Sequence, residues 1–344
     1  MSSIISEVET VSNVSNNEKM DVKDQINKFA RPDWRRSVWQ LINSVIPYFA
    51  LLVGMYYSLE ISYWLTLALA VPAAGFLIRI FIIFHDCGHG SFFKSQKVST
   101  IVGYFTGILT LVPYHDWRFN HARHHATSSD LDRRGVGDVW TMTTREYLAL
   151  PARQRLQYRL FRNPLVMFGI GPLYSSLIVP RFTPPGTKKR ERRSVYLTNL
   201  SLLAVVILMS ILIGFKTYLL IQLPVIFFAW SLGIWLFYVQ HQYEDAYWER
   251  HEDWDYQEAA LRGSSFYKLP AVLQWFTGNI GFHHVHHLNA RIPNYNLQKC
   301  HEQVDLFREV KPLTLLTSLK SLRFRLYDEE LGRMIGFREL KADA

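Results

Sequence analysis

Residues 38–58 read VWQLINSVIPYFALLVGMYYS and contain no charged side chain. After the tripeptide Ser58-Leu59-Glu60, residues 61–84 continue as ISYWLTLALAVPAAGFLIRIFIIF, in which Arg79 is the only charge. About 20 apolar residues in a helix are enough to cross a hydrocarbon core of roughly 30 Å. The stretch therefore predicts two membrane-spanning helices joined by a tight turn.

A second pair of long apolar segments is likewise separated by only a short break. Residues 195–215 and 217–240 are separated only by Lys216. Four spans in two hairpins place both chain ends and the long middle region on one side of the membrane. Of 38 Lys and Arg residues, 6 lie in residues 1–37, 17 in residues 85–194 and 13 in residues 241–344. Because cations gather on the cytoplasmic side, these three regions are predicted to be cytoplasmic and the protein a multi-pass protein of the cell membrane.

The composition of the 344-residue chain agrees with this division. Charged residues are 19% of the chain, below the roughly 25% usual for soluble domains, and apolar residues are 49%. The net charge of +9 indicates an anionic partner, either nucleic acid or an anionic membrane surface. Since the cations flank the apolar blocks, we predict a membrane and no nucleic acid. Two cysteines exclude a disulfide scaffold.

The remaining regions complete the predicted domain organisation. Residues 1–30 are predicted to be a flexible cytoplasmic tail, residues 31–337 a membrane domain and residues 338–344 a C-terminal tail. Two shorter apolar stretches, residues 98–113 and 164–180, lie inside the cationic middle region. They are predicted to be re-entrant or interfacial, because a further span would divide the histidine clusters between the two sides of the membrane.

Nine of the 13 histidines form three clusters, here called boxes. On a helix, positions i, i+3 and i+4 share one face, so each box can aim its imidazoles, which are good ligands for transition metals, at one point. Chance would produce only roughly 0.02 HxxHH patterns in such a chain. The boxes are HxxxH at His85 and His89, HxxHH at His121, His124 and His125, and HxxHH at His283, His286 and His287, with His284 as an extra histidine.

The positions of the boxes bring them to one level. His85 directly follows the second span, and a lone His241 directly follows the fourth. The other two boxes lie in the cytoplasmic segments, so all four groups can meet at the cytoplasmic membrane surface. Nine imidazoles exceed the six positions of one metal and favour two metals. A metal transporter or sensor stays an alternative, although transport would call for polar residues inside the spans.

The three boxes, in this order between two hairpins, resemble the membrane-bound fatty acid desaturases. Their wider superfamily includes acyl, alkane and carotenoid hydroxylases, which share metal and fold and differ in product. The resemblance covers residues 29–337. Four sequence segments are similar to bacterial acyl-lipid desaturases of the Bacillus type: residues 79–85, 237–241, 263–270 and 274–281.

The resemblance implies an all-α integral membrane protein with four transmembrane helices and a cytoplasmic, histidine-rich helical cap. It also implies an oxygen-dependent oxidoreductase that inserts a cis double bond into the acyl chains of membrane phospholipids, and some close members act at carbon 5. An acyl or hydrocarbon hydroxylase is the alternative within the superfamily, and a non-catalytic membrane metal-binding protein or transporter is the alternative outside it.

The resemblance further implies two iron ions (Fe²⁺), molecular oxygen as co-substrate, and a separate ferredoxin or flavodoxin as electron donor. By family match, the iron ligands are His85, His89, His121, His124, His125, His241, His283, His286 and His287. Metal-bound imidazoles usually donate their other N–H to a carboxylate or carbonyl. Candidates for such supporting residues are Asp86, Asn120, Glu244, Asp245, Asn279 and His284.

The other histidines and the arginines near the boxes receive simpler interpretations. His115, His251 and His301 fit no box and are predicted to be structural, as is Cys87. Four arginines are candidates for contact with a lipid headgroup or an acidic electron donor, or form a solvated basic surface. They are Arg118, Arg123, Arg133 and Arg134.

Overall fold

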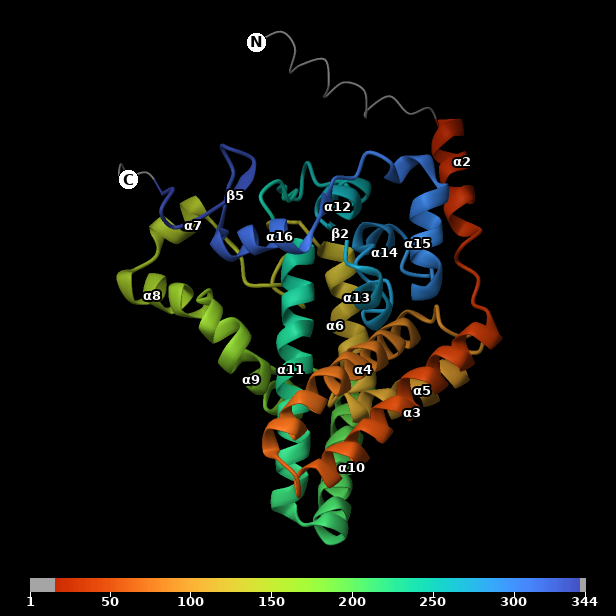
Figure 1. Cartoon of the computed structure of the whole chain (residues 1–344). Helices are drawn as coiled ribbons and strands as arrows, with labels where there is room; N and C mark the ends of the chain where they lie inside the picture. Colours follow the sequence, from red (N-terminus) through yellow and green to blue (C-terminus); the bar gives the residue numbers. More distant parts are fainter. Residues whose placement is uncertain (1–15, 341–344) are drawn as a thin grey trace.

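The computed structural model describes residues 16–340, and four long helices dominate it (Figure 1). Each is long and apolar enough to cross a membrane, which agrees with the number of spans predicted. They are α3 (Trp34–Ser58), α4 (Tyr63–His89), α10 (Lys189–Ile213) and α11 (Phe215–His241).

The ends of these helices differ from the predicted ones for local reasons. Helix α4 does not end at residue 84 but runs on through the first box to His89. It ends at Gly90, whose φ of 70° is the left-handed conformation that glycine adopts without strain. The break between α10 and α11 falls at Gly214, with φ 84°, and not at Lys216, because a lysine can continue a helix.

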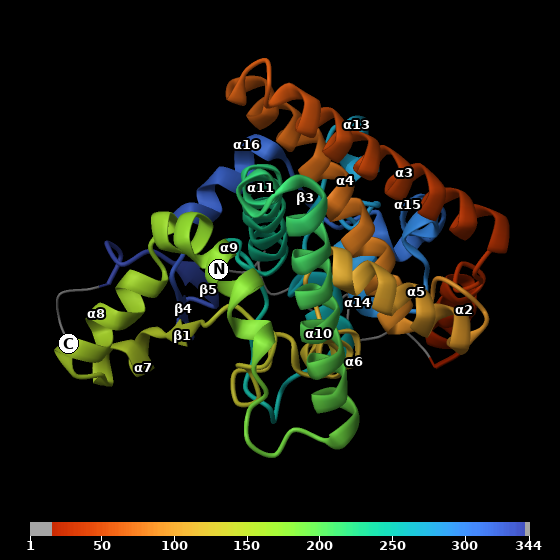
Figure 2. The same ribbon diagram turned by 90° about the horizontal axis from the view of Figure 1, so that it is seen from below.

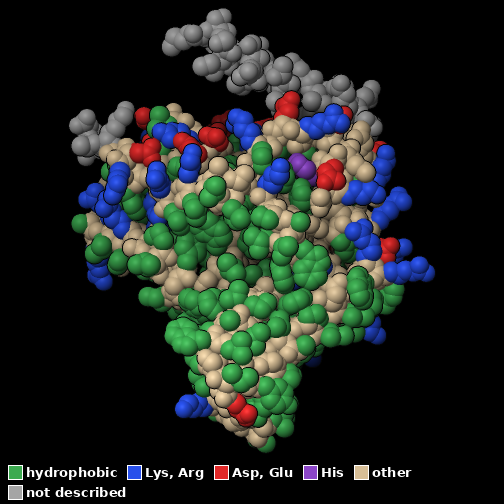
Figure 3. Space-filling view, in the orientation of Figure 1, with side chains coloured by type: hydrophobic (Ala, Val, Ile, Leu, Met, Phe, Trp, Pro, Cys, Tyr) green, Lys and Arg blue, Asp and Glu red, His purple; other side chains and the backbone are tan. Residues whose placement is uncertain are grey.

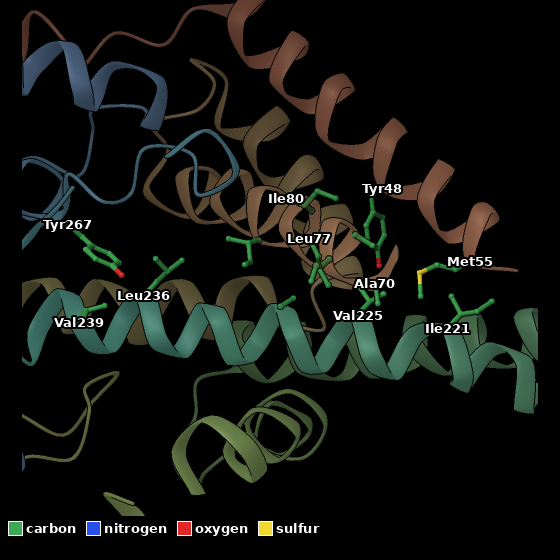
Figure 4. Close-up of a cluster of buried hydrophobic side chains, with 14 residues drawn as sticks. Tyr48, Met55, Ala70, Leu77, Ile80, Ile221, Val225, Leu236, Val239 and Tyr267 are labelled. Atoms are coloured by element: carbon green, nitrogen blue, oxygen red, sulfur yellow. The ribbon is translucent and has the colours of Figure 1, made fainter. Parts of the chain in front are cut away.

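Helices α3 and α4 lie side by side, as do α10 and α11, and α11 also packs against α4 (Figures 1 and 2). The core between them contains Tyr48 from α3, Leu77 from α4, and Val225 and Leu236 from α11 (Figure 4). Small residues such as Ala70 let the helices approach closely. This packing brings the end of α4, which carries the first box, and the end of α11, which carries His241, to the same region.

Shorter elements surround that region. The helices are α2 (Asn16–Asn27), α5 (Gln96–Leu109), α6 (Tyr114–Thr127), α7 (Thr144–Ala149), α8 (Ala152–Phe161), α9 (Gly171–Leu177), α12 (Tyr256–Arg262), α13 (Ala271–Phe276), α14 (His283–Leu288), α15 (Asn294–Gln303) and α16 (Leu315–Ser318). Single turns are the π-helix η1 (Val166–Ile170) and the 3₁₀ helices η2 (Val179–Arg181), η3 (Asp305–Phe307) and η4 (Leu319–Arg323).

Two small sheets were not predicted from the sequence. One joins β1 (Met142–Thr143), β4 (Leu326–Asp328) and β5 (Arg333–Ile335) in the order β1-β4-β5, with β1 parallel and β5 antiparallel to β4. The other pairs β2 (Phe266–Tyr267) with β3 (Pro312–Leu313) in parallel. The chain is mostly helical, as predicted, but these strands correct the expectation of helices alone. Strands of two or three residues are too short to leave an alternating pattern.

The surface separates into an apolar part and a charged part, as the sequence separates into apolar and cation-rich segments. In Figure 3, hydrophobic side chains cover the tapering lower half, and Lys, Arg, Asp and Glu gather around the broad upper part. The exposed apolar side chains include Trp39 and Val53 of α3 and Leu200 and Ile211 of α10. Continuous apolar surface of this extent is a feature of proteins that contact a bilayer.

The predicted tails and short apolar stretches have these places in the fold. Residues 1–15 and 341–344 lie outside the described residues, whereas α2 packs on the protein through the buried Ile26, and Leu340 packs beside β5. Residues 98–113 contribute most of α5, and residues 164–180 contribute η1, α9 and part of η2. Since α5 has only 14 residues, or roughly 21 Å, it is too short to span. The interfacial or re-entrant placement stays a prediction.

Replacing Gly103 of α5 with alanine is expected to destabilise the protein. A Cβ at this position would overlap the ring of Tyr114, which is fully buried and donates a hydrogen bond from its hydroxyl to the Cys87 carbonyl inside the first box. Such overpacking costs about 1–3 kcal/mol, so thermal unfolding in detergent should occur at a lower temperature. Gly233→Ala in α11 is the control, because its Cβ meets nothing within 4 Å. Equal unfolding temperatures for the two variants would contradict the packing argument.

Candidate metal centre

The box histidines and His241 converge from four helices. His85 and His89 lie one turn apart at the end of α4, and the three residues of the second box lie on α6. His241 is the last residue of α11, and the third box forms most of the short helix α14. Because the side chains in each box are separated by three or four positions, they leave their helix on one side.

The nine histidines divide into two groups, in each of which the nearest ring nitrogens all lie within 4.8 Å of one another. The five-histidine group contains His85, His89, His121, His125 and His286. The four-histidine group contains His124, His241, His283 and His287.

The two HxxHH boxes contribute to the groups reciprocally. In the second box the i, i+4 pair His121 and His125 joins the five-histidine group, and His124 joins the other. In the third box the i, i+4 pair His283 and His287 joins the four-histidine group, and His286 crosses to the five-histidine group. With 3.6 residues per turn, side chains four residues apart point in more similar directions than side chains three residues apart. Each HxxHH box therefore reaches both groups.

Distances between ring nitrogens test whether these groups suit metal ions. The Nε2 atom of His125 lies 3.2 Å from that of His121 and 3.0 Å from that of His286. The Nε2 atom of His283 lies 3.0 Å from that of His241 and 3.1 Å from that of His287. Two nitrogens about 2.1 Å from one metal and at right angles to each other are about 3.0 Å apart. The spacing therefore fits neighbouring ligands of one ion.

Unpaired nitrogens support the same interpretation. The Nε2 atoms of His89 and His124 are buried and have no hydrogen-bond partner. A buried polar atom without a partner is costly, and a metal ion at each group would satisfy it. One imidazole nitrogen has a single proton or a single lone pair, so His125 Nε2 and His283 Nε2 cannot make full hydrogen bonds to both of their neighbours.

Burial also favours the neutral, metal-binding form of the imidazoles. Loss of solvent, reinforced by neighbouring histidines, holds the pKa values of five side chains in the second and third boxes well below the ordinary value near 6.5. This applies to His121, His125, His283, His286 and His287. Neutral imidazole offers a lone pair without first losing a proton.

Acceptors outside the groups orient three of the rings. Asp86 Oδ1 lies 3.1 Å from His85 Nδ1, and Asp138 Oδ1 lies 2.5 Å from His124 Nδ1. The carbonyl oxygen of Gly263 lies 3.1 Å from His241 Nδ1. An acceptor at Nδ1 requires that this nitrogen hold the proton, which leaves the Nε2 lone pair free to face the group.

Comparison with known proteins identifies the family. The family model for fatty acid desaturases matches residues 62–312, which include all nine histidines. The chain belongs to the fatty acid desaturase family.

Curated relatives agree with this assignment. A fatty acid desaturase of Bacillus subtilis is 51% identical over 92% of this chain and 90% of its own length. An sn-1 oleoyl-lipid 12-desaturase of Synechocystis is 27% identical over 81% of this chain and 77% of its own. An sn-1 acyl-lipid omega-3 desaturase (ferredoxin) of Nostoc is 28% identical over 74% of this chain and 72% of its own length. This chain is accordingly an oxidoreductase of the desaturase class.

The six residues that the sequence suggested as hydrogen-bond partners of metal-bound imidazoles differ in what they contact in this desaturase. Asp86 contacts a box histidine as described above. Asn120 donates to Asp116, Glu244 accepts from Arg333, and Asn279 donates to the carbonyl of Asn294. Asp245 is exposed. His284 points away from the two groups and lies 3.0 Å, Nε2 to Nδ1, from His301. Proximity in sequence therefore identified one of the six as a contact of a box histidine.

Asp138 was not among the sequence candidates, because it lies 14 residues after the histidine that it contacts. The run Gly135-Val-Gly-Asp138 is the available signal, since turn glycines before a carboxylate indicate a tightly folded loop. Gly137 has a φ of 75°, and a Cβ there would lie 3.2 Å from the Cβ of His124. The glycine thus lets the loop approach α6 closely enough for Asp138 to reach the ring.

Two of the histidines outside the boxes contact residues other than the box histidines that would hold a metal ion. His251 Nδ1 lies 2.9 Å from the buried Asp130, and His301 packs among aromatic rings beside His284. Among the arginine candidates, Arg133 pairs with Asp130 and Arg134 with Glu146. Their guanidinium groups therefore tie the loop after α6 together.

Proposed function

We propose that this desaturase inserts a cis double bond into acyl chains of membrane phospholipids, using two iron ions held by eight box histidines and His241. The observation that carries the proposal is the division of these histidines into two adjoining groups with ligand-like nitrogen spacing. A single mononuclear site would leave several imidazoles without a function, because one ion accepts about six ligands.

In this proposal, the five-histidine group holds one ion and the four-histidine group holds the other. Bound iron, with molecular oxygen as co-substrate, supplies the oxidising power needed to remove hydrogen from an unactivated methylene. The protein supplies orientation: Asp86, Asp138 and the Gly263 carbonyl fix three rings by their Nδ1 protons. The four-histidine group is buried throughout, as are His85 and His286 of the other group, and this burial limits the access of water to the reacting carbon.

The membrane arrangement is part of the proposal. Helices α3 and α4 form one hairpin through the bilayer, and α10 and α11 form the other. His89 and His241 end their spans, so both groups lie at the cytoplasmic surface together with the cation-rich segments. An acyl chain can reach this level from the adjacent leaflet without leaving the bilayer.

Names of relatives support the choice of substrate and donor. The Synechocystis relative acts on an oleoyl lipid, and the Nostoc relative is an acyl-lipid desaturase that carries ferredoxin in its name. We therefore propose lipid-linked acyl chains as substrate and a ferredoxin or flavodoxin as electron donor.

Fatty-acid profiling tests the proposal. The wild type is expressed with a compatible ferredoxin in a bacterium whose membrane lipids are saturated, and double bonds are located by derivatisation and mass spectrometry. We expect a new monounsaturated acid in the phospholipid fraction, and the fragment masses give its double-bond position, for which carbon 5 is the expectation from resemblance. A hydroxy acid would assign the chain to the hydroxylase branch instead. Absence of any product from iron-loaded protein would contradict the proposal.

A further inference from the structure

A buried amide lies behind the first box. Asp86 follows His85 on α4, and its Oδ1 atom is the acceptor near the His85 ring. Its other oxygen, Oδ2, accepts two hydrogen bonds from one residue, Asn294 at the start of α15: one from the backbone N–H at 2.7 Å and one from Nδ2 at 2.8 Å. Both side chains are almost fully buried, with 1% exposure each.

Asn294 is itself held from two other parts of the chain. Gln40 of α3 donates from Nε2 to Asn294 Oδ1 at 3.0 Å, and Asn279 donates from Nδ2 to the Asn294 carbonyl at 3.2 Å. The hydrogen-bonded series therefore runs from Gln40 through Asn294 and Asp86 to His85. The contact from Gln40 and the Nδ2 contact to Asp86 use side-chain groups that an apolar residue at position 294 would lack.

These contacts restrict which residue can occupy position 294. The side chain must donate to a carboxylate on one side and accept from Gln40 on the other, which an amide does with its two ends. Hydrogen bonds to a carboxylate are stronger than those between neutral groups. Space is also limited, because a Cβ at Gly278 would lie 3.3 Å from Asn294 Oδ1.

We propose that Asn294 is a positioning residue of the five-histidine group. It fixes the Asp86 carboxylate, and through that carboxylate the His85 ring, so that His85 Nε2 faces the other four histidines. The proposal rests on the proposed function, since it assumes that the five-histidine group binds a metal ion. Asn294 contacts no box histidine itself and acts through Asp86.

Selective loss of one metal site is the expected consequence of disturbing Asn294. In Asn294→Asp, which keeps the shape of the side chain, a carboxylate oxygen replaces the Nδ2 donor and repels Asp86. Loss of a partner behind a metal ligand typically weakens metal affinity by about 10–100-fold. Only the five-histidine group contains His85, so the four-histidine group should keep its ion.

The experiment is an anaerobic titration of metal-free full-length protein in detergent with Co²⁺, followed by visible absorption and by the metal bound per chain. Wild type should bind two ions, and Asn294→Asp should bind one with wild-type affinity and the second about 10–100-fold more weakly. Asn294→Ser, which shortens the side chain without adding charge, should weaken the same ion if Asn294→Asp does not fold.

Asn296→Asp is the matched control. It makes the same charge change two residues later on α15, where Asn296 accepts from Arg36 at 2.7 Å and does not reach Asp86. The control should bind two ions as wild type does. Two ions bound normally by both Asn294 variants, equal weakening of both sites, or the same loss in Asn296→Asp would overturn the inference. Wild type that binds fewer than two ions would instead overturn the proposed function.

Discussion

His124→Ala is expected to abolish desaturation and to lower the iron content, while the protein still inserts into the membrane. His124 is 1% exposed, and its Nε2 atom has no hydrogen-bond partner and belongs to the four-histidine group. Alanine would leave that group with three potential ligand nitrogens and would remove the imidazole ring that Asp138 contacts. Since loss of a mere supporting partner costs about 10–100-fold, loss of the ligand should cost more than about 100-fold in product formed per mole of protein.

The measurement for His124 combines three readings on membranes of the same expression host: unsaturated acid by mass spectrometry, protein by immunoblot, and iron per purified chain. His251→Ala is the control, because His251 contacts Asp130 and belongs to neither group. It should keep most of the activity. A His124→Ala protein with unchanged iron content and retained product would refute the assignment of His124 as a ligand.

Asp138→Ala is expected to reduce iron affinity or the rate of product formation by about 10–100-fold. The Asp138 carboxylate lies 2.5 Å from His124 Nδ1 and accepts a hydrogen bond from its N–H, which holds the lone pair of Nε2 toward the four-histidine group. Without it, the ring can rotate, and either nitrogen can carry the proton. Asp138→Asn keeps an oxygen acceptor of similar reach but not the charge, so its loss should be smaller than that of alanine.

Asp132→Ala gives the comparison for Asp138. This exposed residue of the same loop pairs with Arg250 at 2.7 Å and not with a box histidine. Its replacement should change iron content and rate little, because exposed ion pairs contribute roughly 0–1 kcal/mol. If both aspartate variants lost activity equally, a general effect on loop folding would explain the result, and the role proposed for Asp138 would be wrong.

The sequence predicted the features that depend on spacing along one element. A run of 21 uncharged residues at 38–58 predicts a long apolar helix in any tertiary context, and α3 contains that run. Likewise, residues three and four apart share a helix face, so each box had to present its histidines together. Helix ends were less predictable, since Gly90 and Gly214 end helices through local backbone conformations that hydropathy does not record.

What the sequence determined by itself was the set: four apolar spans, three boxes, and His241 placed beside them at the end of a span. What only the tertiary structure decided was the partition. Box spacing leaves open which histidines of different helices face one another, and the packing of α4, α6, α11 and α14 divides them into five and four. It also brings Asp138 to His124 and Asn294 to Asp86 across 14 and 208 residues. Periodicity along a helix fixes directions within that helix, whereas contacts between distant segments depend on how whole elements pack.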